Sequence, residues 1–206
     1  WWVFTGVNVP RKIPQVVLNT TGNNAIVDWV WLELRDAGNS LTVRAARPAL
    51  LQRDGDVVEL DGARPVNMGF ANGSYYFVLK HRNHFGVMTA NAIPLRGTSA
   101  TVNFKLSATA TYGSGAQQDM SGTQVLWCGN VVVDSSIKYT GTSNDRDPVI
   151  AFIGGSTPNN TVAGYRLEDV NLDGVVKYTG ANNDRDPILV NVGSSVPTNT
   201  RTQQLP

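Results

Sequence analysis

Hydrophobic residues in the first half of the chain alternate with polar ones over short stretches, and this period is typical of β-strands. The longest such stretch is residues 25–35. Its even-numbered positions are mainly Ile, Val and Leu, whereas its odd-numbered positions include Trp29 and Trp31 followed by two charged residues. Because successive side chains of a strand point to opposite faces, this stretch is expected to bury one face in a sheet.

Further short strands are expected along the same half, separated by turn signals such as Asp54-Gly55. They cover residues 41–48, 49–54, 55–61, 66–70, 74–82, 86–95 and 101–106. Strands of this length, with a turn signal about every 8–12 residues, are typical of antiparallel sandwiches. We therefore expect residues 19–112 to form a mainly β domain, an antiparallel β-sandwich of immunoglobulin or transthyretin-like type.

Residues 1–18 are apolar and β-prone, but Pro10 and Pro14 interrupt them. Proline cannot donate a hydrogen bond to a strand ladder, so the segment fits a sheet edge or an extended arm. One hypothesis is an edge strand of the domain's own sheet. The other is an arm that completes a neighbouring subunit's sheet by strand addition and so builds extracellular filaments. A start at Trp1 without Met also suggests a processed product of a larger precursor.

The second half contains one unit twice, after an expected junction at residues 113–118. Residues 138–148 and 177–187 agree at 9 of 11 positions and lie 39 residues apart. In the second copy Asn183 suits a helix cap, the carboxylates after it complement the positive helix end, and Pro187 is tolerated in a first turn. We therefore expect residues 113–206 to form a duplicated module of two loops, each followed by a short helix.

The second copy begins with oxygen-bearing side chains at alternate positions, Asp169, Asn171 and Asp173, and Gly174 follows. This pattern indicates a calcium loop, because Ca²⁺ prefers about six to eight oxygen ligands and a tightly curled loop points every second side chain inward. Glycine supplies the positive φ of the sharp turn, so that the main-chain carbonyl of Val175 becomes a further expected ligand.

A closing carboxylate is still required, and the twelfth position, which supplies it in an EF-hand, is Gly180 here. The candidates come after an insertion, at Asp184 and Asp186. The first copy is degenerate, with Asn130, Val132 and Ser135 in place of Asp169, Asn171 and Gly174, while Asp134, Asp145 and Asp147 remain. It is the weaker candidate for calcium. For both copies the alternative is a turn whose side chains hydrogen-bond their own backbone.

The tandem units resemble a type I dockerin, apart from the insertion before the closing Asp. A longer resemblance covers residues from about 20 to 206. It rests on Asn23-Asn-Ala-Ile-Val-Asp-Trp29, Ala49-Leu-Leu-Gln-Arg-Asp-Gly-Asp56, Lys80-His-Arg-Asn-His-Phe-Gly-Val-Met-Thr-Ala90, Trp127-Cys-Gly-Asn-Val131, Tyr165-Arg-Leu-Glu-Asp-Val-Asn-Leu-Asp-Gly174 and Thr202-Gln-Gln-Leu-Pro206. These resemble the C-terminal region of large secreted, adhesin-like or haemagglutinin-type surface proteins of Bacteroidetes. Such proteins usually carry Asp-x-Asn-x-Asp-Gly in both copies, from which the first copy here departs.

Composition favours an extracellular protein. Only 16% of the residues are charged and the net charge is +1, which leaves no basic surface for nucleic acid. No signal peptide or membrane-spanning run is visible. The one cysteine, Cys128, excludes an internal disulfide, so a secreted chain of this kind would gain from bound calcium as a staple. Cys128 itself is expected to be a buried small residue.

No catalytic constellation is visible, so we expect no enzyme. His81 and His84 are expected to form a hydrogen-bonded cluster at a strand end, and Asp54-Gly-Asp56 a turn. The sequence predicts a secreted, non-enzymatic structural or adhesive module stabilised by calcium, which associates with itself or with other surface proteins. A carbohydrate-binding module is the first alternative, because Trp29 and Trp31 share one face of a strand and aromatic faces stack on sugars. A dockerin-type docking module is the second.

Overall fold

The computed structural model of the protein describes residues 13–97 and 99–206. The described chain is mainly β. Its helices and strands are α1 (Gln15–Leu18), a 3-10 turn (Gly22–Asn24), β1 (Ile26–Asp36), β2 (Val43–Gln52), β3 (Val57–Val58), β4 (Gly73–Lys80), β5 (Val87–Met88), β6 (Ile93–Leu95), β7 (Gln117–Met120), β8 (Thr123–Leu126), β9 (Ser136–Lys138), α2 (Arg146–Phe152), β10 (Thr161–Ala163), β11 (Val175–Lys177), α3 (Arg185–Asn191) and β12 (Thr200–Thr202). None of the described helices is long and apolar enough to cross a membrane.

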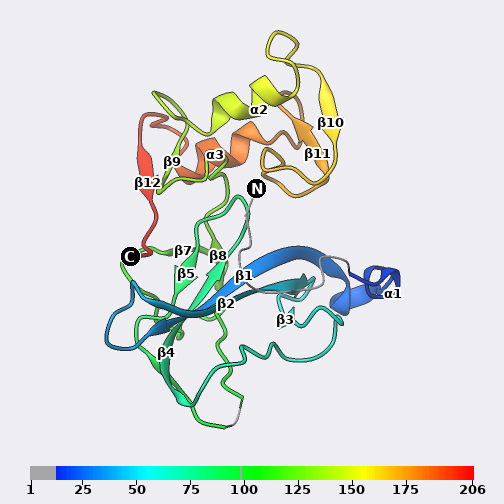
Figure 1. The fold of residues 1–206 in the computed structure, drawn as a ribbon. Coiled ribbons are helices and arrows are strands. Elements are labelled where there is room, and N and C mark those ends of the chain that lie inside the picture. The colour runs from blue at the N-terminus through cyan, green and yellow to red at the C-terminus, as the bar shows by residue number, and fades with distance from the viewer. Residues whose placement is uncertain (1–12, 98) are drawn as a thin grey trace.

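Strand β1 is the centre of a six-stranded antiparallel sheet in the N-terminal half (Figure 1). The strand order is β3-β2-β1-β4-β5, and β6 pairs with the first residues of β4. On one side Trp29 of β1 lies opposite Leu50 of β2, and on the other Leu32 lies opposite Leu79 of β4. The mainly β, antiparallel character expected from the alternating pattern is confirmed.

Several expected strands differ from the observed ones. Residues 41–48 and 49–54 are not two strands, because β2 runs straight through Pro48. Proline lacks an amide hydrogen and is tolerated where no neighbouring strand needs one. Strand β3 pairs only with Leu50 and Leu51, so the outer edge of β2 has no strand partner beside Pro48 among the described residues. Residues 66–70 and 101–106 are irregular. Asn67 and Asn103 explain this, because each side chain accepts a hydrogen bond from the amide two residues ahead and so makes a turn.

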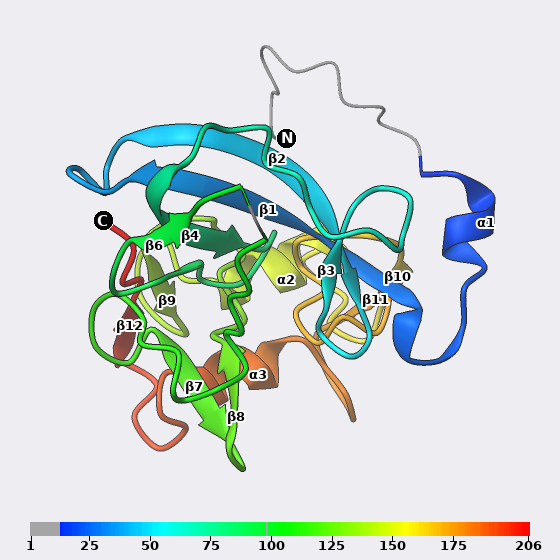
Figure 2. The same cartoon turned by 90° about the horizontal axis from the view of Figure 1, so that it is seen from below.

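The segment expected as an extended arm or edge strand is helical at its C-terminal end (Figure 2). Pro14 precedes α1 with a φ of −58°, which suits a helix start. Val17 of α1 is buried against Leu50 and Val58 of the sheet, and Trp29 packs on the same cluster. Burial of Val17 therefore favours a helical turn over an edge strand at residues 15–18. Residues 1–12, the remainder of the expected arm, lie outside the described residues.

The two copies of the C-terminal module interlock. Strand β9 of the first copy pairs with β12, which follows the second helix, while β11 of the second copy pairs with β10, which follows the first helix. Helices α2 and α3 lie side by side in Figure 1. Each copy thus completes a two-stranded sheet with the segment that follows the helix of the other copy. The predicted loop–helix units are present.

A residue of the sheet domain enters the hydrophobic core of the module. Phe85, which follows β4, is buried among the apolar residues of both copies, which include Ile137, Val149, Val176 and Ile188. The C-terminal residues return to the sheet, where the side chain of Gln203 accepts a hydrogen bond from the amide of Gly86 (3.0 Å) and the carbonyl of Pro206 accepts one from Arg35 of β1 (3.2 Å). The repeat module and the sheet therefore pack against each other.

Candidate metal centre

The second loop, residues 169–186, is curled by its own oxygen-bearing side chains. Asp169 Oδ2 accepts a hydrogen bond from the amide of Gly174 (3.2 Å), Asn171 Oδ1 from that of Asp173 (2.9 Å), and Asp173 Oδ1 from that of Val175 (2.9 Å). Gly174 has a φ of +86°, as the sharp turn requires. The alternate side chains predicted as ligands therefore all face their own loop.

Asp169 is the most deeply placed of these side chains, with 2% of its surface exposed. Its Oδ1 atom is buried and has no hydrogen-bond partner among the described residues. A guanidinium nitrogen of Arg82 lies 3.6 Å from Oδ2, beyond hydrogen-bond distance. A buried carboxylate oxygen without a partner is costly, because it has lost its water. A cation in the loop would satisfy it, so the residues present fit calcium at this position.

The structure separates the two candidates for the closing ligand. Asp184 is fully buried, and its carboxylate accepts hydrogen bonds from the amides of Val170, Asn171 and Lys177. Burial raises the pKa of this carboxyl above its ordinary value. Asp184 therefore ties the start of the loop to β11. Asp186 instead lies at the start of α3, where its exposed carboxylate accepts hydrogen bonds from Asn183 and Arg185.

The side chains of the second loop do not form a preassembled cage. Within residues 13–97 and 99–206, no group of three or more His, Cys, Asp or Glu side chains is close enough together to hold a metal ion. Asp173 is exposed at the rim of the loop. Val175, the expected carbonyl ligand, begins β11 and lies opposite Ala163 of β10. The ligand set that the loop offers thus includes an Asn and a main-chain carbonyl besides its carboxylates.

The first loop, residues 130–147, has the same frame, in which a buried aspartate accepts hydrogen bonds from main-chain amides, but the side chains inside the loop differ. Asp145 is fully buried and accepts hydrogen bonds from the amides of Val132 and Lys138, and burial raises its pKa to about 6. Asn130, however, uses both ends of its amide on Asp134: Oδ1 accepts from the main-chain amide (3.0 Å) and Nδ2 donates to the carbonyl (2.8 Å). The first loop therefore closes on itself.

The remaining residues of the first candidate site are also hydrogen-bonded to residues close to them in the sequence. Asp134 Oδ1 accepts hydrogen bonds from the amide and the hydroxyl of Ser136. Asp147 lies at the start of α2 and pairs with Asn144 and Arg146, as Asp186 pairs with Asn183 and Arg185. The structure thus brings Asn130, Asp134 and Asp145 together and leaves Asp147 apart, which matches the self-bonded turn.

A polar cluster that the sequence did not predict joins the second loop to the sheet. Asp28 of β1 accepts hydrogen bonds from the hydroxyl of Tyr165 (2.6 Å) and from Arg82 (3.2 Å), whose guanidinium also stacks 4.2 Å from the Tyr165 ring centroid. Burial opposes ionisation of Asp28, but its contacts with His81 and Tyr165 outweigh this and hold its pKa at about 2. No local pattern reveals the cluster, because its members are up to 137 positions apart.

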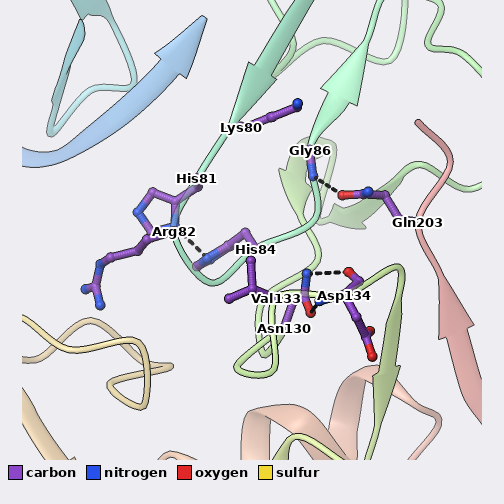
Figure 3. Close-up of a pocket in the computed structure, with 9 residues that line it drawn as sticks. All are labelled: Lys80, His81, Arg82, His84, Gly86, Asn130, Val133, Asp134 and Gln203. Atoms are coloured by element: carbon purple, nitrogen blue, oxygen red, sulfur yellow. Dashed lines mark hydrogen bonds between the residues drawn. The ribbon is translucent and has the colours of Figure 1, made fainter. Parts of the chain in front are cut away.

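The expected histidine cluster at the end of β4 is confirmed (Figure 3). His81 Nε2 lies 2.9 Å from Asp28 Oδ2, and the Nδ1 atoms of His81 and His84 are 2.9 Å apart. His84 Nδ1 is also 2.9 Å from Asn83 Oδ1, which only accepts, so the proton is assigned to His84 Nδ1. Burial and the neighbouring His81 and Arg82 lower the pKa of His84 to about 3, and the ring is neutral.

A pocket of about 190 Å³ lies between the histidines and the first loop. Lys80, His84, Asn130, Asp134 and Gln203 are among its lining residues. Figure 3 shows the guanidinium of Arg82 directed away from Lys80. The Lys80 ammonium is paired with Glu33 of β1 at 2.6 Å. The pocket is small, and the Lys80 ammonium that lines it is already paired.

Two further expectations have structural counterparts. Cys128, expected to be buried, is partly buried against the core of the module. Its sulfur accepts a hydrogen bond from Asn191 (3.1 Å), and burial raises the pKa of its thiol. The Asp54 side chain accepts a hydrogen bond from the amide of Asp56 and forms the expected turn.

The chain was also compared with known proteins. No protein-family model, no curated protein and no solved structure matches it. What the two loops do is therefore inferred from their own geometry.

Proposed function

We propose that this chain is a non-enzymatic structural or adhesive module of a secreted surface protein, and that calcium in its second loop stabilises it. The observation that carries the calcium proposal is the buried Oδ1 atom of Asp169, which lacks a hydrogen-bond partner among the described residues. The Oδ1 atoms of Asn171 and Asp173 instead accept from backbone amides of the loop, and Asp173 Oδ2 accepts from the Asn171 side chain. Asp169, Asn171, Asp173, the Val175 carbonyl and Asp184 are the proposed ligands. Asp186 is not among them, because it is exposed and paired at the helix start.

Secretion and adhesion are supported by the low charge content and by the resemblance of the sequence motifs to those of surface proteins. Calcium concentrations outside cells suit a loop of this kind, since extracellular modules bind calcium with dissociation constants of about 10⁻⁴–10⁻³ M. Calcium would act as a staple in a chain that has no other covalent or metal crosslink among its described residues.

A chelator experiment tests the calcium proposal. A ligand that binds only the folded state stabilises it by about 2.7 kcal/mol at a hundredfold excess over its dissociation constant, which corresponds to about 5–10 °C in melting temperature for a chain of this size. Chelation should lower the melting temperature of the wild-type protein by this amount. Asp173→Ala should abolish the response, while Asp134→Ala in the first loop should retain it. Equal melting with and without chelator in all three proteins would refute calcium binding.

Self-association is a second candidate function, and one surface feature favours a docking role for the module. Arg146 lies over the Tyr139 ring and Arg185 over the Tyr178 ring, each with its guanidinium carbon 5.1 Å from the ring centroid. Arginine and tyrosine are enriched at the centres of protein interfaces. Replacing both arginines with alanine and measuring the oligomeric state by analytical ultracentrifugation tests this surface.

The filament and glycan-binding hypotheses can each be tested by a simple comparison. The filament hypothesis predicts that removing residues 1–12 yields a folded monomer from a polymerising chain. The deletion stops at residue 12 because Val17 packs against the sheet. A glycan-binding role has less support, since Trp29 packs against the cluster of Val17, Leu50 and Val58. Binding to a glycan array that is lost on Trp31→Ala would restore the glycan-binding hypothesis.

A further inference from the structure

Asn83 lies where the sheet domain meets the beginnings of both loops. It comes three residues after the end of β4 and is fully buried. Its main-chain carbonyl accepts hydrogen bonds from the amides of Gly129 (2.9 Å) and Asn130 (3.0 Å), at the start of the first loop. Its side chain reaches the start of the second loop. One residue of the sheet domain therefore contacts the first ligand position of each copy.

The side-chain contacts of Asn83 are complete. Its Nδ2 atom donates to the carbonyls of Leu167 (2.8 Å) and Asp169 (2.7 Å), and its Oδ1 atom lies 2.9 Å from the protonated Nδ1 of His84. Both protons of the amide are thus used on the peptide segment that ends at Asp169. Because the Asp169 side chain must point into the loop to meet the amide of Gly174, the orientation of this segment sets the position of the carboxylate.

Other residues of the sheet domain hold the same segment less directly. Tyr165 donates to Asp28 of β1, and Arg82 lies between Asp28 and Asp169. These contacts are between side chains, and Tyr165 is largely exposed. Only Asn83 holds the main chain at Asp169 itself among the described side chains of the sheet domain. A group that orients a metal ligand through hydrogen bonds typically changes metal affinity about 10–100-fold when removed.

We propose that Asn83 is a positioning residue for the calcium loop at Asp169, supplied by the sheet domain rather than by the loop's own module. This inference rests on the proposed calcium function. It implies that calcium affinity depends on the packed interface between the domains, so that calcium binding and the joining of the domains reinforce one another. Because Asn83 contacts the first loop through its main chain alone, a side-chain substitution affects the second loop selectively.

Calorimetric titration of the full chain with CaCl₂, at a temperature well below melting, tests the proposal. Asn83→Ala is expected to raise the calcium dissociation constant about tenfold. The control is Asn72→Ala, an exposed asparagine of the sheet domain whose Oδ1 accepts a hydrogen bond from the backbone amide of Gly97 and which has no hydrogen bond to either loop among the described residues. The control should bind calcium within about twofold of the wild-type affinity. A residue with a merely structural role would lower the melting temperature in chelator and leave the dissociation constant of the folded protein unchanged.

The outcomes separate the two proposals. If the wild-type chain takes up no calcium, the proposed function is rejected and this inference with it. If the wild-type chain binds calcium and folded Asn83→Ala binds equally well, Asn83 has no positioning role and the calcium function stands. Should Asn83→Ala not fold, Asn83→Asp keeps the side chain's size and its acceptor toward His84 while replacing the Nδ2 donor. It is expected to show the same loss, and equal binding by this variant would also overturn the proposal.

Discussion

The two loops of the C-terminal module have nearly the same frame but differ at their first ligand position, where Asn130 corresponds to Asp169, and also at Val132 and Ser135, which correspond to Asn171 and Gly174. In both, a fully buried aspartate, Asp145 or Asp184, accepts main-chain amides from the loop and from the strand after it. In the first loop the side-chain amide of Asn130 donates one hydrogen bond to the main chain of Asp134 and accepts another from it. In the second, Asp169 leaves a buried oxygen without a partner among the described residues.

This difference shows how a small chemical change separates a turn from a candidate metal site. An amide has a donor and an acceptor, so Asn130 closes its loop without help. A carboxylate without a proton only accepts, so each Asp169 oxygen requires a donor or a cation. Oδ2 has the amide of Gly174 and an ion pair with Arg82 at 3.6 Å, whereas Oδ1 has no hydrogen-bond partner among the described residues. We infer that the duplicated unit is a scaffold that folds with or without metal, and that the residue at its first position determines whether a cation is needed.

The largest expected effect comes from removing the buried aspartate that both frames share. Asp184→Ala leaves three amides without their acceptor and should lower the free energy of unfolding by about 3 kcal/mol or more, and Asp145→Ala by about 2 kcal/mol or more, because each unsatisfied buried group costs about 1–3 kcal/mol. Urea denaturation in the presence of chelator measures both. Asp186→Ala, at an exposed helix start, is the control and should cost less than about 1 kcal/mol. A small loss for Asp184→Ala would mean that the frames do not depend on this residue.

The next effect tests the first ligand position directly. Asp169→Asn gives the second loop the amide that the first loop has, so it should remove the calcium-dependent part of the unfolding free energy, about 2.7 kcal/mol at a hundredfold excess of calcium over the dissociation constant. Urea denaturation with and without calcium gives this difference. Asp134→Asn in the first loop should leave it unchanged. If Asp169→Asn still responds to calcium, the contrast between the loops lies elsewhere.

A smaller and gradual effect of pH on stability is expected from His84, the neighbour of Asn83. His84 is neutral in the folded protein with a pKa of about 3, whereas an unfolded histidine has a pKa of about 6.5. Below pH about 6.5 this histidine binds a proton in the unfolded chain but not in the folded chain. The contribution of His84 therefore lowers the free energy of unfolding as the pH decreases, by up to about 1.4 kcal/mol per pH unit down to pH about 3. Burial raises the pKa of Asp145 to about 6 and also raises that of Asp184, and these carboxyls act in the opposite direction over part of this range. Unfolding curves at pH 7, 6 and 5 should therefore show the His84 contribution as a difference, with more stability lost on acidification by the wild-type protein than by His84→Gln. Identical slopes would place the titrating group elsewhere.

Local patterns were sufficient for the features that depend on neighbouring residues. The alternation of residues 25–35 corresponds to β1, and the repeated Asn-Asp-Arg-Asp-Pro motif marks the starts of α2 and α3. The Asp169, Asn171 and Asp173 side chains curl their loop as the spacing predicts. The same reasoning failed at residues 66–70 and 101–106, where side chains of Asn67 and Asn103 form turns within apolar stretches. It also left Asp184 and Asp186 as equal candidates, because only burial distinguishes them.

The sequence by itself determined the strand-rich first half, the duplicated loop–helix unit and the residue types that make the second loop a candidate for calcium, since each depends on periodicity or on spacing within a few residues. Only the tertiary structure decided that the two copies exchange their exit strands, that Phe85 enters their core, and that Asn83 and Arg82 reach Asp169. These contacts join residues that are distant in the sequence. They are selected by burial of apolar surface and by the need to pair buried polar groups, neither of which leaves a local pattern.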